Sequence, residues 1–256
     1  MKLKPTTKPV KNRRKLTPPV ASANIQLKTI LATTDFSEVS RSGVRYAVAL
    51  AEKLGAAVAL LHVVEPRSRL SELGSIVPAR DEAEVVPLAR AQLATLAKRE
   101  SKTDVAVTFS VRTGKPFNTI ATAAREHAVD LIVIATHGYT GAERVLLGST
   151  AERVVRRAPC PVVTVPTRAL PKRASKAPAF KLTRILVPID FSILSNDALP
   201  YATLLAGHFD AELTLLHVVE ESPIDRLLDC ELTNETLAPM MKQAGADLNH
   251  MAEKLG

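Results

Sequence analysis

The sequence has no tryptophan, few aromatic residues and only two cysteines, and each scarcity argues against a class of function. Aromatic side chains make up 4% of the chain, too few for a stacking platform that binds single-stranded nucleic acid. Cys160 and Cys230 stand far apart without the spacing of a metal or redox site, which favours a reducing, cytoplasmic location. No apolar run approaches the length of a membrane span, and the N-terminus lacks the apolar core of a secretory signal.

The net charge of +8 raises the question of a nucleic-acid partner, but this charge is unevenly distributed. Residues 1–24 contain seven Lys and Arg and no acidic residue, and residues 167–181 contain five, so the rest of the chain carries −4. Basic segments of such composition are typically solvated. We therefore expect a disordered basic tail over 1–25 and a linker over 167–182. Only the tail is expected to touch nucleic acid or anionic lipid, and only weakly.

Part of the chain is duplicated. The stretch "ILATTDFSEVS" at 30–40 matches "ILVPIDFSILS" at 185–195, and "ALLHVVEP" at 59–66 matches "TLLHVVEE" at 214–221. Both matches have the same offset of 155 residues. A constant offset through a strand, a helix and a second strand indicates two copies of one structural unit.

The first copy, residues 26–166, alternates between apolar runs that suit buried strands and segments with helical spacing. Such alternation predicts a doubly wound α/β fold with a five-stranded parallel sheet, for which right-handed crossovers leave few strand orders. We favour the order 3-2-1-4-5. The expected strands are 29–34, 57–64, 104–111, 130–135 and 161–166, and the expected helices end at Gly55 or cover 81–100, 117–127 and 149–158.

The order 3-2-1-4-5 has its switch point between strands one and four, where open α/β sheets bind ligands beyond the carboxyl ends of the strands. Strand one ends at Asp35, and strand four ends in the polar stretch 135–138. We expect a crevice there.

The second copy, residues 183–256, is incomplete. The offset maps its last residue onto Ser101, so it contains a β-α-β-α unit and no counterpart of residues 102–166. A fragment with two strands has little core of its own.

Between strand four and the next helix, Gly138, Gly141 and Gly148 precede the hydroxyls of Ser149 and Thr150. Such a loop can strap a phosphate chain, because glycines allow close approach of main-chain N–H groups and a helix N-terminus follows. Two plainer interpretations stay open: the glycines are turn residues, or Ser149 to Glu152 form a capping box. The loop is neither a Walker loop nor a GxGxxG motif.

The stretch "ATHGYTGAERVLLGSTAERVVRRAPCPVVTVP" strongly resembles the C-terminal signature of the universal stress protein (UspA) family. The stretches "ILATTDFS" and "LLHVV" resemble its first two strands. The resemblance covers 26–166 fully and 183–256 as a partial second copy, and it implies an adenine nucleotide α-hydrolase-like fold. The family's ATP-binding members carry G-x2-G-x9-G-[ST]. This chain matches at Gly138, Gly148 and Ser149 and departs at the first glycine, which is Ala135.

The resemblance implies roles for eleven residues in binding ATP. Asp35 would bond the adenine or ribose, Thr33 and Thr34 would border the base, and Val63 would offer main-chain groups to the adenine edge. The ribose and first phosphates would face Ala135, Thr136, His137 and Gly138, and the outer phosphates would lie on Gly148, Ser149 and Thr150. Plainer interpretations exist for single residues: Asp35 as a helix N-cap, His62 and His217 as packed strand residues, His137 as a loop residue without a catalytic partner.

The resemblance therefore implies an ATP-binding stress-resistance or regulatory module with Mg²⁺ arriving on the triphosphate, and the sequence shows no dedicated catalytic or metal-ligating residues. Two alternatives stay open: a slow ATP-hydrolysing or adenylylating enzyme, and an interaction protein that binds no nucleotide. We expect a homodimer through the apolar edge strand 161–166, because family members often pair there and the second copy lacks the matching strand.

Overall fold

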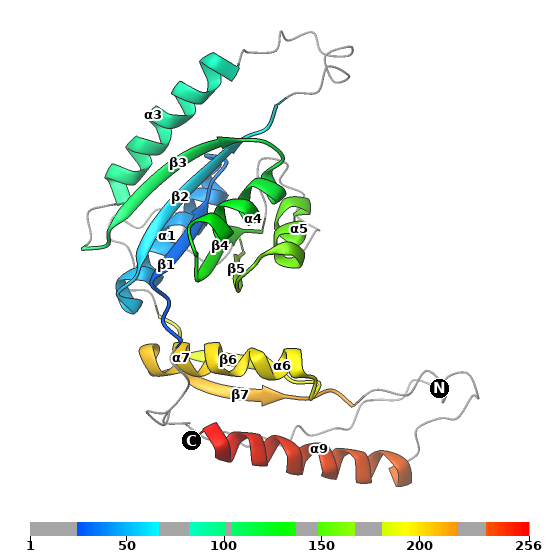
Figure 1. Cartoon of the computed structure of the whole chain (residues 1–256). Helices are drawn as coiled ribbons and strands as arrows, with labels where there is room; N and C mark the ends of the chain where they lie inside the picture. Colours follow the sequence, from blue (N-terminus) through cyan, green and yellow to red (C-terminus); the bar gives the residue numbers. More distant parts are fainter. Residues whose placement is uncertain are drawn as a thin grey trace. The chain divides into compact units, whose positions relative to one another are not determined.

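The computed structural model describes residues 25–66, 82–100, 104–136, 148–166, 181–219 and 234–255. The chain divides into two compact units, the first beginning at Gln26 and the second including the residues from Lys181 on (Figure 1). Predictions made for the basic tail over 1–24, most of the linker, Cys230, His137 and Gly138 lie outside the described residues.

The first unit is built on a five-stranded parallel sheet in the order β3-β2-β1-β4-β5, which confirms the predicted fold class and strand order. The three inner strands are mostly apolar, as expected where helices cover both faces of a parallel sheet, whereas β3 at one edge alternates apolar and polar residues. Their bounds are β1 Thr29–Thr33, β2 Ala57–Val64, β3 Val107–Thr113, β4 Leu131–Ala135 and β5 Val162–Val165.

Among the described residues, four helices alternate with these strands, and right-handed crossovers place α1 and α3 on one face and α4 and α5 on the other (Figure 1). Helix α1 starts where the Ser37 hydroxyl accepts from Ser40 N–H at 3.1 Å, and it ends at Gly55, whose φ of 67° suits glycine. The helices are α1 Glu38–Leu54, α3 Glu82–Glu100, α4 Pro116–Glu126 and α5 Ser149–Arg157.

The face under α4 and α5 holds the core that matters most for the crevice. Leu31 and Leu61 from the two central strands are 2% and 1% exposed there, and they pack against apolar residues of both helices. The helical members of this cluster are Ile120, Ala123, Ala124, Ala151 and Val154. Cys160 packs at the edge of the same cluster, and burial raises the pKa of its thiol to about 11, as expected of a packed cysteine.

The structure corrects one expected boundary and decides one alternative that the sequence left open. The third strand covers 107–113 instead of 104–111, a shift typical of boundaries read from an apolar run. The capping box at Ser149 does not form, because Gly148 is the N-cap of α5 and no side chain caps it. Glu152 bonds Arg156 one turn later, at 3.2 Å, rather than reaching back to the helix start.

The second unit contains a two-stranded parallel sheet and three described helices, where the sequence predicted two. Pro200 stands at the position equivalent to Arg45 in the middle of α1, and its missing N–H interrupts the helix between α6 and α7. The elements are β6 Arg184–Pro188, α6 Ile193–Asp197, α7 Leu199–Phe209, β7 Glu212–Leu216 and α9 Asn234–Leu255.

Strand β5 pairs with β4 alone among the described residues, so it forms one edge of the five-stranded sheet. Its pairing with a second chain stays a prediction.

Candidate functional site

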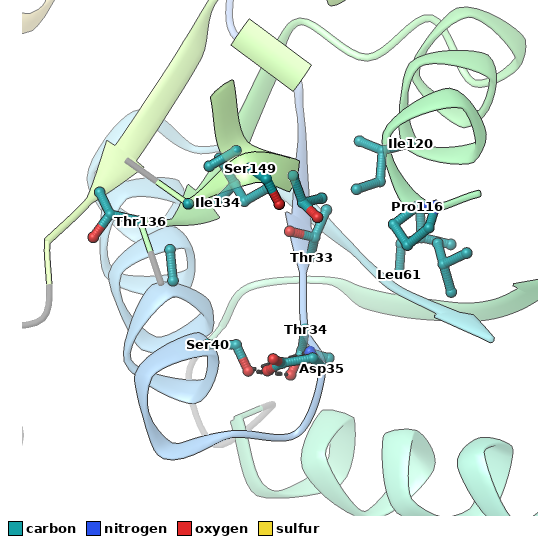
Figure 2. A pocket seen from close by; sticks show the side chains of 15 residues that line it. Thr33, Thr34, Asp35, Ser40, Leu61, Pro116, Ile120, Ile134, Thr136 and Ser149 are labelled. Atoms are coloured by element: carbon teal, nitrogen blue, oxygen red, sulfur yellow. Dashed lines mark hydrogen bonds between the residues drawn. The ribbon is translucent and has the colours of Figure 1, made fainter. Parts of the chain in front are cut away.

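A cavity of about 300 Å³ opens at the carboxyl ends of β1 and β4, the switch point of the strand order. Figure 2 shows Thr34, Asp35 and Ser40 together at one end and Leu61, Pro116 and Ile120 gathered on another side. The walls are therefore polar near the end of β1 and apolar beneath α4. Its complete lining is Thr33, Thr34, Asp35, Ser40, Leu61, Val63, Pro116, Ile120, Ile134, Ala135, Thr136, Gly148, Ser149, Thr150 and Ala151.

Asp35 lies at the polar end and is held in place by the turn that follows it. Its Oδ1 accepts from Ser37 N–H at 3.0 Å, and its own N–H donates to the Ser40 hydroxyl at 3.3 Å. Burial raises the pKa of Asp35, but hydrogen bonds from Ser37 and Ser40 outweigh that effect, so the pKa lies below its ordinary value. Asp35 is thus an ionised acceptor at neutral pH and not the N-cap of α1, which is Ser37.

Thr34 and Ser40 complete this polar end. Their hydroxyls lie 2.9 Å apart, and both residues are buried, at 6% and 5% exposure. Thr34 was predicted from the sequence to be a site residue, whereas Ser40, which lines the cavity from the first turn of α1, was not. The signal for it was the recurrence of a serine at this position in the second copy, as Ser195.

The helix start at the opposite wall offers fewer main-chain donors than the sequence suggested. Gly148 N–H donates to the Thr136 carbonyl at 2.6 Å, so it is already bonded within the chain. The next two N–H groups, of Ser149 and Thr150, belong to the first turn of α5, where helical partners are lacking by geometry. A bound anion would therefore meet the amides and hydroxyls of Ser149 and Thr150.

The alanine that replaces the first glycine of the family motif is accommodated on the α1 side of the sheet. A Cβ atom at Gly43 of α1 would lie 3.5 Å from the Ala135 methyl and 3.4 Å from the Ala135 nitrogen. The methyl therefore packs toward α1, and Ala135 borders the cavity without its side chain filling it.

The main chain of β2 passes the cavity beyond the point where β1 leaves the sheet. The paired register ends with Thr33 opposite Leu61, after which Thr34 N–H donates to the Leu61 carbonyl at 3.0 Å. Main-chain groups two residues apart in a strand point to the same side. The N–H and C=O of Val63 therefore face the side that β1 has vacated, where Val63 lines the cavity.

Nine of the eleven residues singled out from the sequence line this one cavity, and His137 and Gly138 lie outside the described residues. The apolar wall from Leu61, Pro116, Ile120, Ile134 and Ala151 was missed, since apolar residues at helix and strand positions carry no signal beyond packing. Within the described ranges no Lys or Arg lines the cavity, and no cluster of three or more potential metal ligands occurs.

The family comparison agrees with this geometry. The model of the universal stress protein family matches residues 26–166 and again 181–255. The chain belongs to the universal stress protein family. Its first matched segment contains the five-stranded sheet and the cavity, and its second contains the two-stranded unit.

Three members of the family illustrate the range of similarity. A universal stress protein of Methanocaldococcus jannaschii is 33% identical over 143 residues, which are 54% of this chain and 81% of that protein. The structure of a universal stress protein from Archaeoglobus fulgidus DSM 4304 aligns with 87% of this chain and 74% of its own, at 22% identity and a TM-score of 0.58. Another Archaeoglobus fulgidus structure is a complex with dAMP; it is 20% identical and covers 55% of this chain and 98% of its own, with a TM-score of 0.41.

Among the residues that the structure describes, no helix has both the length and the apolar character needed to cross a membrane.

Proposed function

We propose that the first unit binds ATP in the cavity between β1 and β4, and that the chain acts as a nucleotide-responsive regulatory module. The observation that carries this proposal is the convergence on one cavity of nine motif residues, which lie in β1, β2, β4 and α5 or directly adjoin these elements. A crevice at the switch point of a doubly wound sheet is where such folds bind their ligands. Its size, about 300 Å³, falls at the lower end of the range for small-molecule sites.

The polar end suits the nucleoside. Asp35 is an ionised acceptor whose Oδ1 accepts from Ser37 N–H. A carboxylate can accept further hydrogen bonds from ribose hydroxyls or an amino group. The Val63 main chain supplies a donor and an acceptor toward the same space. The apolar wall of Leu61 and Ile120 suits the face of a purine.

The α5 end suits the phosphates, because two main-chain N–H groups and two hydroxyls meet there at a helix N-terminus. Since no cationic side chain lines the described part of the cavity, we propose that Mg²⁺ enters with the triphosphate and neutralises part of its charge. Ser149 or Thr150 would supply the protein oxygen nearest to that ion. When bound, the ion would screen the phosphates.

Isothermal titration of the whole chain with Mg-ATP tests the proposal, and the duplication supplies a matched control. Asp35 and Asp190 both accept from the N–H two residues later, at 3.0 and 2.9 Å, but only Asp35 lines the cavity. Replacing Asp35 by Ala should weaken ATP binding at least about ten-fold, the effect of losing a hydrogen bond to a charged group. Replacing Asp190 by Ala should leave the affinity unchanged.

A second variant probes the phosphate end. Gly148 has φ −67° and ψ 152°, which a branched residue can adopt, so Gly148→Val should fold and fill the cavity mouth. Combined with Ser149→Ala it should abolish the heat of binding while the unfolding temperature stays near that of the unaltered chain. Absence of binding by the unaltered chain, or equal losses from Asp35→Ala and Asp190→Ala, would contradict the proposal. Phosphate release measured in the same samples separates binding from turnover.

A further inference from the structure

His62 lies in β2 beside the turn that follows β1, and no motif assigns it a part in ligand binding. The geometry points to His62 as a positioning residue that keeps the main chain of Val63 open to the edge of a bound adenine. This inference rests on the proposed function, which it deepens by naming what selects the base.

The imidazole bonds the carbonyl of Thr34, the first residue after β1. Its Nδ1 lies 2.8 Å from the Thr34 carbonyl oxygen. A carbonyl only accepts, so Nδ1 carries the proton and the ring donates this bond.

That carbonyl is the one that the next bond of the β1–β2 ladder would use. In a parallel pair, a residue whose N–H donates to a carbonyl of the partner strand accepts, with its own carbonyl, from the N–H two residues further along that partner strand. Thr34 N–H receives the Leu61 carbonyl, so the Thr34 carbonyl would next accept from Val63 N–H. The His62 ring takes that place instead, and the paired register stops at Thr33.

The same ring also supports the turn that presents Asp35. Phe36 has a φ of 66°, an uncommon value for a bulky residue, and its N–H donates to the Thr34 hydroxyl at 3.0 Å. The Phe36 and His62 rings pack against each other in a tilted arrangement, with their centroids 4.3 Å apart. His62 thus contacts the two residues that flank Asp35, through the carbonyl of Thr34 and the ring of Phe36.

The exposed pair of main-chain groups has a definite chemical preference. An adjacent N–H and C=O complement adenine, whose N1 accepts while its amino group donates. Hypoxanthine has the reverse arrangement, with a donor at N1 and a carbonyl acceptor beside it. The site should therefore prefer ATP to inosine triphosphate, because a mismatched pair leaves polar groups unsatisfied.

The second copy repeats the histidine without the cavity. His217 Nδ1 lies 2.7 Å from the Ile189 carbonyl oxygen, and its ring packs against the tilted ring of Phe191 with the centroids 4.6 Å apart. Replacement of His217 therefore removes the same local contacts away from the proposed nucleotide, which makes it a matched control.

The experiment compares binding of ATP, inosine triphosphate and inorganic triphosphate to the whole chain and to His62→Leu, His62→Asn and His217→Leu. Leucine frees the Thr34 carbonyl for Val63 N–H, so the preference for ATP over inosine triphosphate should fall from about ten-fold or more to less than about two-fold. Binding of inorganic triphosphate should not change. Asparagine keeps a donor near the position of Nδ1 and should retain the preference, as should His217→Leu.

The possible results distinguish the role of His62 from ATP binding itself. A His62→Leu protein that still prefers ATP as the unaltered chain does would overturn the role of His62 while leaving ATP binding intact. If His62→Leu does not fold, a folded His62→Asn protein that loses the preference overturns it as well. Equal binding of ATP and inosine triphosphate by the unaltered chain would contradict recognition of the base by the Val63 main chain. Binding of neither nucleotide would contradict the proposed function itself.

Discussion

The β1–α1–β2 segment of the first unit and the β6–α6–α7–β7 segment of the second share the same local interactions. The N–H two residues later donates to Asp35 at 3.0 Å and to Asp190 at 2.9 Å. The His62 and His217 rings bond the carbonyl 28 residues earlier at 2.8 and 2.7 Å. The turn between strand and helix, together with its histidine contact, therefore forms in the same way in both units.

What differs is the cover on one face of each sheet. Leu31 in β1 is 2% exposed under α4 and α5, whereas its counterpart Leu186 in β6 is 59% exposed. Asp35 lines a cavity whose other walls come from β4, α4 and α5, and the described residues of the second unit include no counterpart of these elements. The local motif thus supplies half a site, and the second half of the fold makes it a cavity.

The largest expected difference between the two units is in the loss of stability when each of these two leucines is replaced by alanine. Leu31→Ala should lower the free energy of unfolding of the first unit by about 2–5 kcal/mol, because it removes buried methyl groups and leaves a void. Leu186→Ala should change that of the second unit by less than about 0.5 kcal/mol, as is usual for exposed positions. Urea unfolding followed by circular dichroism, with hydrogen exchange to assign each transition, measures both.

A large loss from Leu186→Ala would contradict this comparison, since it would mean that the exposed face of β6 is covered in solution. Leu213→Ala serves as the positive control within the second unit, because Leu213 is 5% exposed and belongs to its core.

A smaller effect is expected inside the helices. Thr203 of α7 is 4% exposed, and its hydroxyl has no hydrogen-bond partner among the described residues. The equivalent residue of α1 is Val48, which is 5% exposed. Thr203→Val should stabilise the second unit by about 1 kcal/mol, since it removes an unsatisfied buried group, and Val48→Thr should destabilise the first unit. A loss of stability in Thr203→Val, measured by thermal unfolding, would indicate a bonded hydroxyl.

The sequence was sufficient for the arrangement of the sheet, because apolar runs of β-branched residues alternated with helical spacing and glycine marked the end of α1 at Gly55. The repeat could be recognised from the sequence because Asp35, His62 and their counterparts contact other residues of the same duplicated segment. These contacts depend only on the strand–helix–strand segment and not on the rest of the chain.

The details that escaped prediction depend on contacts between distant segments. Whether Gly148 N–H is available to a ligand is decided by the Thr136 carbonyl, and the room for the Ala135 methyl is provided by Gly43. The interrupted helix of the second unit is an exception, since Pro200 stood in the sequence and the likeness to α1 obscured it.

The acid titration of the two aspartates compares the segments most finely. Hydrogen bonds from Ser192 and Ser195 lower the pKa of exposed Asp190 to about 2, whereas burial raises the pKa of Asp35 and offsets part of the lowering by its serines. We therefore expect both to titrate below 3.8, with Asp35 above Asp190, in carbon NMR of the side-chain carboxyls.

A carboxyl whose folded pKa is lowered stabilises the fold above its unfolded pKa, and this contribution is lost as the pH falls through the folded value. Asp35→Asn and Asp190→Asn should each reduce the loss of stability between pH 4 and pH 2. Titration of Asp190 at 3.8 or higher would mean that its turn is open in solution, and that the local sequence alone does not hold it.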